Sequence, residues 1–412
     1  MKFKRIFVIV CDSMGAGYEP DAALFGDEGA NTLLHISDKC NGLNIPNLNK
    51  LGINDLVPIK NTNKVDHPQS YVMLCREKSN GKDTMTGHWE MMGIDTQKPF
   101  KTFTDTGFPQ ELIDELEEKT GRKIIGNKAA SGTEILVELG EEQKRDGSLI
   151  VYTSSDSVLQ IAAHEETIPV PELYRYCEIA REICNRPEYR LGRIIARPFI
   201  GEDKTCFKRT PNRHDLALSP TGRTAMDDLK DGGYTVSCVG KIADIFNNVG
   251  VTKTQKTVSN TDGMNKTTEQ AKDHSWTGFL FCNLVEFDSE YGHRRNPIGY
   301  GRAIEQFDSE LPALMEQLDE NDLLMITADH GNDPTWKGTD HTREYIPLLC
   351  YSKSFKNGAH LPIRKTFGDI GKTILKNFDI TPSENEIGQP IEELLKLSLI
   401  HISEPTRLQL IS

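Results

Sequence analysis

The sequence of 412 residues lacks the features that mark several common classes of protein. None of its nine cysteines forms a Cys-x-x-Cys pair, so neither a structural zinc site nor a disulfide framework is predicted. No apolar run approaches the roughly eighteen residues that span a bilayer. The stretch Ile6–Cys11 is too short for a signal peptide and ends in Asp12-Ser13 without a cleavage site, so we interpret it as a buried strand.

Basic charge is also scarce. The formal net charge is −13 at pH 7 and the isoelectric point is near 5.4, which argues against nucleic acid and anionic membranes as partners. We expect a cytoplasmic, monomeric protein with free thiols. An acidic chain can still bind an anionic substrate where metal ions and local lysines or arginines reverse the field.

Strand-like and helix-like segments alternate along the chain. Helical periodicity occurs around residues 112–116, 173–183, 303–318 and 367–378, and Pro312 is expected to kink the third of these helices or to begin one. The alternation predicts an α/β fold with a mainly parallel sheet covered by helices on both faces. The apolar, β-branched runs are Ile6–Cys11, Leu149–Tyr152, Ile194–Ile200, Tyr234–Val239, Phe279–Val285, Leu323–Thr327 and Tyr345–Cys350.

The chain divides unevenly into segments with and without candidate catalytic residues. We expect residues 1–98 and 218–396 to form a discontinuous, metal-binding catalytic core, and residues 99–217 to form an inserted cap domain that binds substrate phosphate. Residues 397–412 resemble the translation of a sequencing adapter, so we expect a disordered, non-native tail there. The arginines of the insert are spaced for contact with an anion rather than for one helical face: Arg193, Arg197, Arg209 and Arg213.

Carboxylate and imidazole side chains follow several of the predicted strands. Because α/β enzymes place their chemistry on loops at strand ends, these side chains predict a two-metal site assembled from distant loops. Oxygen and nitrogen ligands without cysteine suit Mn²⁺ or Zn²⁺ better than Ca²⁺. A lone acid or histidine would instead be an ordinary turn residue or a hydrogen-bonded polar group. The candidate ligands are Asp12, Asp288, His293, Asp329, His330 and His341.

A candidate nucleophile lies in the segment Gly81–Glu90, which reads Gly-Lys-Asp-Thr-Met-Thr-Gly-His-Trp-Glu. A hydroxyl residue after a flexible turn is expected at a helix N-terminus, where backbone N–H groups and the helix dipole favour an alkoxide or a phosphate. A threonine in this position is by itself more often a helix cap. Thr84 and Thr86 compete for the role, and metal coordination is the expected activator.

Three motifs together resemble the phosphopentomutases of the bacterial, metal-dependent type, which belong to the alkaline-phosphatase superfamily. The resemblance extends from about residue 4 to residue 396 and includes Gly126–Glu134 and Arg209–Asp215 of the insert. It implies an alkaline-phosphatase-like core with a smaller α/β cap. The motifs are Asp12-Ser13-x-Gly15-x-Gly17, Gly81–Glu90, and Asp329–Asp333 continued by Gly338–Glu344.

The resemblance also implies a role for each candidate residue. It makes Thr84 the phosphorylated nucleophile, because relatives place this residue directly after Asp or Asn and three residues before Gly-His. One Mn²⁺ would be held by Asp12, Asp329, His330 and the Thr84 oxygen, and the other by Asp288, His293 and His341. Sugar-phosphate contacts would come from Ser154, Asp156, Arg193, Ile195 and Arg209 of the insert and from Lys241 of the core.

The implied reaction interconverts ribose or 2-deoxyribose 1-phosphate and 5-phosphate through a phosphothreonine and a pentose 1,5-bisphosphate, with a catalytic sugar bisphosphate as primer. Such an enzyme links nucleoside catabolism to pentose phosphate metabolism. Two alternatives are a metal-dependent phosphatase of the same superfamily, favoured by loss of a closing insert, and a non-catalytic sugar-phosphate sensor, favoured by loss of a ligand or of Thr84. A cofactor-independent phosphoglycerate mutase would be expected to carry Ser in place of Thr84.

Overall fold

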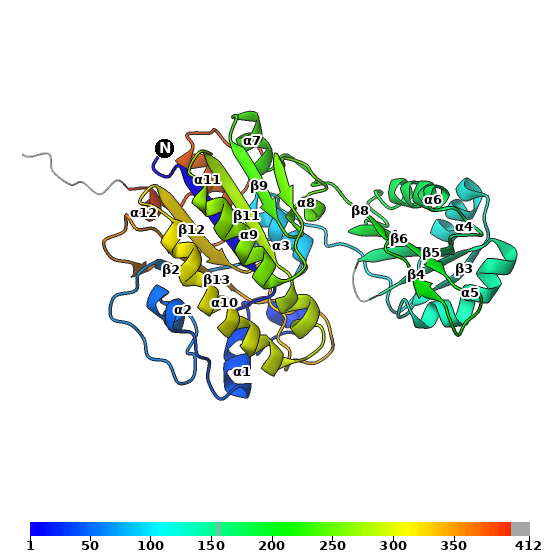
Figure 1. Ribbon diagram of the computed structural model, residues 1–412, viewed down its shortest axis with the longest axis horizontal. Helices are drawn as coiled ribbons and strands as arrows, with labels where there is room; N and C mark the ends of the chain where they lie inside the picture. The colour runs from blue at the N-terminus through cyan, green and yellow to red at the C-terminus, as the bar shows by residue number, and fades with distance from the viewer. Residues whose placement is uncertain (155–156, 397–412) are drawn as a thin grey trace, which may run out of the picture.

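The computed structural model describes residues 1–154 and 157–396. These residues form two lobes that lie side by side, each built around its own sheet (Figure 1). Residues 397–412, the expected tail, and Asp156 lie outside the described residues. In the described part of the chain, no helix combines the length and the apolar character that crossing a membrane requires.

The larger lobe contains, within the described residues, an eight-stranded sheet in the order β10-β9-β11-β1-β12-β13-β2-β14. The strands from β10 to β12 in this order run parallel, whereas β13 is antiparallel to both β12 and β2. The predicted, mainly parallel sheet is therefore confirmed. Its strands are β1 (Arg5–Cys11), β2 (Tyr71–Cys75), β9 (Thr235–Val239), β10 (Lys253–Gln255), β11 (Gly278–Leu284), β12 (Asp322–Thr327), β13 (Ile346–Tyr351) and β14 (Ala359–His360).

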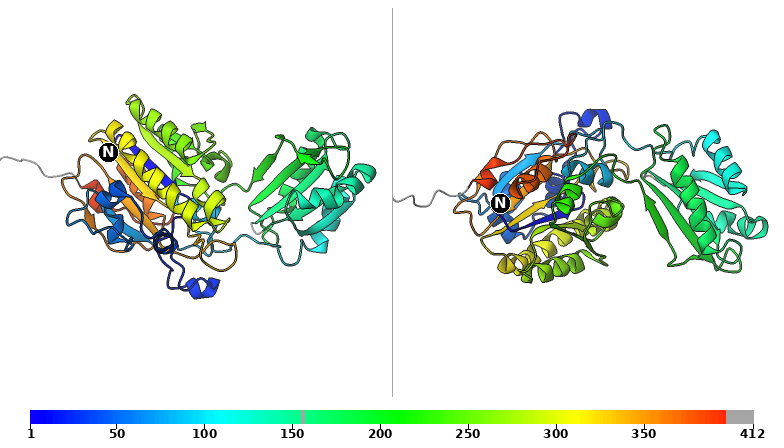
Figure 2. Two further views of the ribbon diagram at one scale, coloured as in Figure 1. Left: turned by 60° about the horizontal axis from the view of Figure 1, so that its bottom comes forward. Right: turned by 90° about the horizontal axis from the view of Figure 1, so that it is seen from above.

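Helices cover both faces of this sheet, which explains why β1, β11 and β12 are buried along their whole length. One layer contains α10 packed against α9, α1 and α2, and the other contains α11 packed against α3 and α7 (Figure 2). The α-helices are α1 (Thr32–Lys39), α2 (Pro46–Leu51), α3 (Thr84–Met91), α7 (Ala225–Asp231), α8 (Ile242–Ile245), α9 (Asn260–Lys272), α10 (Pro297–Gln317), α11 (Asp369–Asn377) and α12 (Glu392–Leu395). Three short helical segments of other types are η1 (Ala22–Phe25), η2 (Ile53–Asp55) and η3 (Phe287–Gly292).

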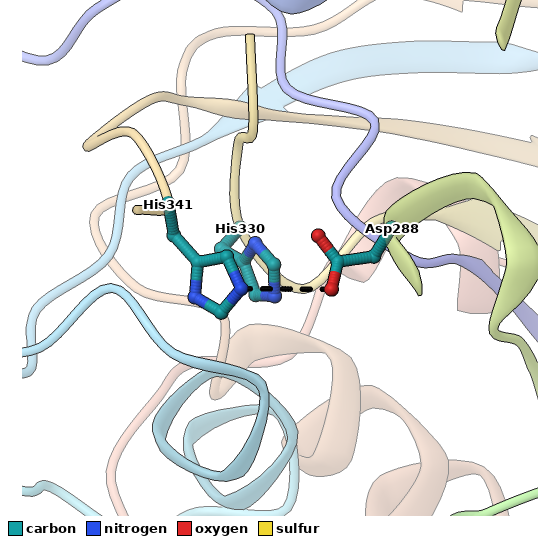
Figure 3. Close-up of side chains that lie close together, drawn as sticks. All are labelled: Asp288, His330 and His341. Carbon is teal, nitrogen blue, oxygen red and sulfur yellow. Dashed lines mark ion pairs between the residues drawn. The ribbon is translucent and has the colours of Figure 1, made fainter. Parts of the chain in front are cut away.

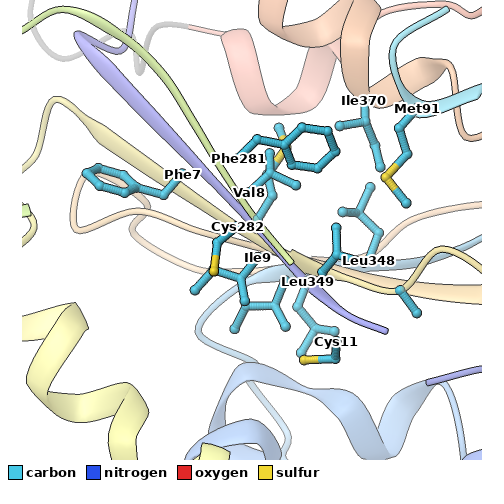
Figure 4. Close-up of a cluster of buried hydrophobic side chains, with 14 of the residues drawn as sticks. Phe7, Val8, Ile9, Cys11, Met91, Phe281, Cys282, Leu348, Leu349 and Ile370 are labelled. Carbon is cyan, nitrogen blue, oxygen red and sulfur yellow. The ribbon is translucent and has the colours of Figure 1, made fainter. Parts of the chain in front are cut away.

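The apolar core fills the space between sheet and helices. Side chains of β1, β11 and β13 meet Met91 at the end of α3 and Ile370 of α11 in one cluster (Figure 4). The expected role of Pro312 needs a correction, because α10 begins at Pro297 after the N-cap Asn296 and continues through Pro312. Pro312 therefore does not begin a helix.

The smaller lobe contains, in the described residues, a six-stranded sheet in the order β3-β4-β5-β6-β7, with β8 also paired to β6. Helices α4 and α6 cover one face, and α5 covers part of the other. All of these strands fall between β2 and β9 in the sequence, while the exact boundaries at residues 99 and 217 stay a prediction. The elements are α4 (Gln110–Thr120), β3 (Ile124–Ala129), α5 (Glu134–Asp146), β4 (Leu149–Thr153), β5 (Val158–His164), α6 (Val170–Ile183), β6 (Arg193–Ile200), β7 (Lys208–Arg209) and β8 (His214–Ala217).

The topology brings the distant motifs of the larger lobe to one edge of the sheet. Strand β1 lies between β11 and β12 and is parallel to both. Asp12 follows β1, Asp288 follows β11 and Asp329 follows β12. Since the carboxyl ends of parallel strands lie at the same edge, these three loops leave the sheet side by side.

Candidate metal centre

The predicted ligands gather beyond the carboxyl ends of β1, β11 and β12. Asp12, Asp329 and His330 form one group, in which the ligand atoms all lie within 4.8 Å of one another. Asp288, His330 and His341 form a second group of the same kind (Figure 3). All of these side chains are buried. His330 belongs to both groups, so it lies between two positions that could each hold an ion.

His293 lies beside the second group. Its Nε2 atom is 3.1 Å from Asp288 Oδ2 and 3.1 Å from His341 Nε2. The His341 Nε2 atom is 3.6 Å from the same oxygen of Asp288. The structure thus brings His293 together with Asp288 and His341, while the assignment of His330 to one ion only stays a prediction.

The surroundings of two buried carboxylate oxygens indicate whether the first group fits a cation. Asp12 Oδ1 and Asp329 Oδ2 make no hydrogen bond within the described chain, and they lie 3.5 and 3.3 Å from His330 Nε2. Burial and the neighbouring carboxylates of Asp329 and Asp288 raise the pKa of Asp12 well above its ordinary value. Because crowded, buried carboxylates need a compensating positive charge, this set of oxygen and imidazole donors fits a divalent cation.

In the second metal-ion position the Asp288 carboxylate faces the imidazoles of His293 and His341. Burial acts to raise the pKa of Asp288, but the imidazoles of His341 and His293 outweigh it and hold that pKa well below its ordinary value. The carboxylate is therefore ionised in the arrangement described. Ionised Asp and two imidazoles are ligands that Mn²⁺ and Zn²⁺ both accept.

Thr84 begins helix α3, in agreement with the expected helix N-terminus. The N-cap is Asp83, whose side chain accepts hydrogen bonds from the backbone N–H groups of Met85 and Thr86. The Thr84 hydroxyl oxygen lies 3.1 Å from His330 Nε2, the atom that Asp12 Oδ1 and Asp329 Oδ2 also approach. A phosphate on Thr84 would also lie at the positive end of the helix dipole.

Thr86, the competing hydroxyl, is held differently. Its hydroxyl group donates a hydrogen bond to Asp83 Oδ2 at 2.6 Å, and the side chain is fully buried. It therefore serves to close the first turn of α3. Thr84, in contrast, is partly exposed and lies beside the first ligand group. The geometry favours Thr84 as the nucleophile.

Helix α3 touches the loop that carries Asp329 through the Gly-His pair that follows Thr84. A Cβ atom on Gly87 would clash with the carbonyl oxygen of Asp329. One residue on, His88 Nδ1 lies 2.8 Å from the Thr84 carbonyl oxygen and 3.2 Å from Asp329 Oδ2. Gly87 permits the close approach, and His88 ties the first turn of α3 to a metal-ligand candidate.

We expect Gly87→Ala to lower the free energy of unfolding by about 1–3 kcal/mol, the usual cost of forcing an extra group into a packed site. The added methyl group has a backbone carbonyl against it, which cannot rotate away. Urea denaturation measures the change. Gly222→Ala is the control, because its Cβ would meet only the side-chain end of Ile94 at 3.3 Å. Equal stability of the two variants would contradict the close contact.

Three polar residues hold Asp12 and Asp288 in place. Asn283 Nδ2 donates to Asp12 Oδ2 at 3.0 Å, and the Tyr300 hydroxyl donates to the Asp12 carbonyl at 3.1 Å. Asn332 Nδ2 donates to Asp288 Oδ1 at 2.7 Å. Only Asn332 carried a signal in the sequence, as part of the segment Asp329–Asp333.

Arg343 is a further residue whose role the sequence did not reveal. Its side chain is buried and donates to the backbone carbonyls of Glu77, Ser79 and Gly81 at 2.8, 2.9 and 2.6 Å. These carbonyls belong to the turn that precedes Thr84, whereas Arg343 itself follows His341 closely in the chain. The arginine therefore couples the turn before Thr84 to the loop that carries His341.

A third cluster of acids and histidine lies at the opposite end of the strands, where β12 begins, and contains Asp322, Asp319 and His274. The Arg5 guanidinium already occupies it: Nε and Nη2 donate to the two oxygens of Asp322 at 2.8 and 2.5 Å. Arg5 Nη2 is also 3.0 Å from His274 Nδ1. A positively charged side chain thus takes the place that a metal ion would need.

The predicted sugar-phosphate contacts of the insert lie on the sheet of the smaller lobe. Arg193 and Ile195 are in β6, Ile195 is buried, and Asp215 of β8 lies opposite Ile195 in the register. The Arg193 Nη1 atom is 4.0 Å from Asp215 Oδ2. Arg209 is exposed on β7, and Ser154 directly follows β4. Asp156 lies outside the described residues.

Lys241, the predicted contact from the larger lobe, precedes α8. Although the Lys241 side chain is exposed, desolvation by the protein around its ammonium group lowers the pKa of that group, and Arg193 lowers it further, while Asp12 and Asp288 act in the opposite direction. The lysine is therefore within electrostatic reach of both the metal-ligand candidates and an arginine of the smaller lobe.

Comparison with known proteins gives one family and several remote structures. A family model described as "Metalloenzyme superfamily" matches residues 4–382. The PH0037 protein from Pyrococcus horikoshii is similar at 16% identity, covering 91% of this chain and 97% of that chain, with a TM-score of 0.46. The Leishmania mexicana phosphoglycerate mutase is similar at 12% identity, covering 94% of this chain and 97% of that chain, with a TM-score of 0.47. The cofactor-independent phosphoglycerate mutase from Thermoplasma acidophilum is similar at 13% identity, covering 90% of this chain and 99% of that chain, with a TM-score of 0.40. These low TM-scores support no conclusion about the chain.

Proposed function

Because this chain belongs to the Metalloenzyme superfamily, we propose that it is a metal-dependent phosphotransferase, and more narrowly a phosphopentomutase. The observation that carries the proposal is the convergence of the Thr84 hydroxyl with buried carboxylate oxygens of Asp12 and Asp329 beside His330. The pentose substrate is supported by the motifs around Thr84 and His341, which resemble those of phosphopentomutases.

The proposed cofactors are two Mn²⁺ ions. When bound, such ions neutralise charge on the transferring phosphoryl group and on the attacking and leaving oxygens. The first would be held by Asp12, Asp329, His330 and the Thr84 oxygen. The second would be held by Asp288, His293 and His341.

Thr84 carries the phosphoryl group in the proposed cycle. A free hydroxyl group of the pentose monophosphate attacks the phosphorus, the bond to Thr84 Oγ1 breaks, and the products are a pentose 1,5-bisphosphate and a free threonine hydroxyl. The bisphosphate then turns around, and Thr84 Oγ1 attacks its other phosphate to regenerate the phosphoenzyme. A trace of sugar bisphosphate supplies the first phosphoryl group.

The smaller lobe is proposed to hold the phosphate that is not reacting. Arg193 and Arg209 offer paired N–H groups, which suit bidentate contact with a phosphate. Ser154, Asp156 and Ile195 would contact the sugar phosphate from the same lobe, with Lys241 on the opposite side. A bound sugar phosphate between the lobes would keep water away from phosphothreonine and so favour transfer over hydrolysis.

The function is tested by incubating the purified chain with ribose 5-phosphate, Mn²⁺ and a trace of sugar bisphosphate. We expect ribose 1-phosphate to form, and a chelator to stop its formation. Release of inorganic phosphate without isomerisation would support the phosphatase alternative. Binding of the sugar phosphate with neither product would support the non-catalytic sensor.

Arg193→Ala is expected to lower the mutase rate and to raise the share of inorganic phosphate among the products. Loss of a charge-assisted contact to phosphate costs about 1.5–3 kcal/mol, or roughly ten- to a hundred-fold. Arg145→Ala on α5 is the matched control, because Arg145 is exposed and pairs with its neighbour Asp146. A product assay in which both variants behave like the wild type would exclude this role of Arg193.

A further inference from the structure

Arg295 lies in the turn between η3 and α10 and joins two loops through its side chain. Its guanidinium group donates hydrogen bonds to carbonyl oxygens of its own turn and of the loop that follows β12. Few side chains can make so many contacts at once, because only arginine carries five N–H donors in a rigid fork. Nε donates to Gly338 O at 2.6 Å and Nη2 to Asp340 O at 3.0 Å. The two N–H groups of Nη1 are shared among Gly292 O at 3.0 Å, Asn332 Oδ1 at 2.5 Å and Asp333 O at 3.2 Å.

These acceptors are next to the three candidate ligands of the proposed second metal ion, Asp288, His293 and His341. Gly292 directly precedes His293, and Asp340 directly precedes His341. Asn332 is the acceptor that uses its side chain, and its own N–H group donates a hydrogen bond to Asp288 Oδ1 at 2.7 Å. The contact from Arg295 to Asn332 Oδ1 orients the amide so that its NH₂ end faces Asp288. One guanidinium group thus reaches a neighbour of all three candidate ligands.

The orientation of His293 depends on the same loop. Its Nδ1 atom lies 2.8 Å from the carbonyl oxygen of Thr339, which follows the Arg295 acceptor Gly338. Because a carbonyl can only accept, Nδ1 carries the proton and donates. The lone pair of a neutral His293 is then on Nε2, which faces Asp288 and His341. This is the tautomer that binds a metal ion.

The backbone of Arg295 adds an independent observation. Its φ angle is 52°, in the left-handed region that asparagine and glycine enter more readily than other residues. The chain therefore keeps an arginine at a position where the backbone alone would favour asparagine. Strained positions of this kind persist where the side chain has a task.

We propose that Arg295 is a positioning residue that holds Asp288, His293 and His341 in the arrangement that binds the second metal ion. This inference rests on the proposed function and deepens it. The first ion should be affected less, because its carboxylates have other supports: Asn283 holds Asp12, and the Ser13 N–H group holds Asp329 Oδ1 at 2.9 Å. Supporting partners of metal ligands typically contribute about ten- to a hundred-fold to affinity.

The test replaces the side chain with one that tolerates the left-handed backbone conformation of this position. In Arg295→Asn the new residue suits the left-handed conformation, so a loss of metal cannot be assigned to backbone strain. Metal-free wild type and variant are titrated with Mn²⁺, and free Mn²⁺ is followed by electron paramagnetic resonance. We expect two ions in the wild type. In the variant we expect a nearly unchanged first ion and a second ion bound about ten- to a hundred-fold more weakly.

Arg294→Ala is the matched control. This neighbouring arginine is 64% exposed and, within the described residues, its side chain pairs with Glu290, so its loss should leave both affinities unchanged. Thermal unfolding supplies a second readout. The metal-free Arg295→Asn protein should melt near the metal-free wild type, whereas the rise in melting temperature caused by Mn²⁺ should be smaller in the variant.

The outcomes separate the inference from the proposed function. If wild type binds two ions and Arg295→Asn binds both as tightly, Arg295 does not position the ligands, and the proposed function stands. Equal weakening of both ions, or a metal-free variant that is already much less stable, would show a general structural role and overturn the inference. A wild type that binds no second ion would overturn both.

Discussion

Replacing Thr84 by alanine is expected to abolish turnover and phosphoenzyme formation together. The hydroxyl oxygen beside His330 is the atom that would carry the phosphoryl group, and alanine has no atom in its place. Loss of a covalent nucleophile lowers enzymatic rates by roughly four or more orders of magnitude. Folding should be little affected, because the Asp83 cap bonds to the backbone of Met85 and Thr86 and not to the Thr84 side chain.

Thr86→Ala is the matched comparison, since it removes a hydroxyl group two residues away on the same helix. Its lost hydrogen bond to Asp83 should cost about 1 kcal/mol of stability, while phosphoenzyme formation continues. The measurement is peptide mapping by mass spectrometry after incubation with a sugar bisphosphate. Phosphate located on Thr86, or a phosphorylated Thr84→Ala protein, would overturn the assignment of the nucleophile.

Asp288→Asn is expected to remove about one metal ion per chain and to reduce activity by roughly two or more orders of magnitude. The amide keeps the shape of the side chain and can still accept the hydrogen bond from Asn332, so the fold should survive. It lacks the charge that His293 and His341 face. A metal ion stabilises transition-state charge by several kcal/mol, and each 1.36 kcal/mol corresponds to a factor of about ten in rate.

Metal analysis after gel filtration, combined with the mutase assay, measures both effects in the same sample. Glu290→Gln is the control on the same turn, because Glu290 is 40% exposed and pairs with Arg294. Its metal content and rate should match those of the wild type. Full two-ion occupancy with near-normal turnover in Asp288→Asn would remove Asp288 from the set of ligands.

Much of the larger lobe could be predicted because its signals are local. The strands β1, β11 and β12 are continuous apolar runs, which a parallel sheet covered on both faces requires. Thr84 could be placed at a helix N-terminus from the Gly-Lys-Asp turn before it. Asp12, Asp288 and Asp329 could be chosen because each follows such a run.

Other elements had too little local signal in the sequence to be predicted. Strand β5 is fully buried, yet Gln160 and His164 interrupt its apolar pattern. Tertiary partners satisfy both side chains: Gln160 Oε1 accepts from Arg197 at 2.9 Å, and His164 Nε2 lies 2.8 Å from the Gly201 carbonyl. The antiparallel edge formed by β13 and β2 was not predicted either, because strand direction depends on the path of the connections.

The sequence by itself determined the kinds of residue at the site and the strands that end in them, since periodicity and turn chemistry act over a few neighbouring residues. Only the tertiary structure decided which atoms meet. It placed His330 within both ligand groups and brought Arg343 to the turn before Thr84. The physical reason is that hydrogen bonds such as those from Arg295 and Arg343 join segments far apart in the chain, and their geometry exists only after the sheet has set the loops side by side.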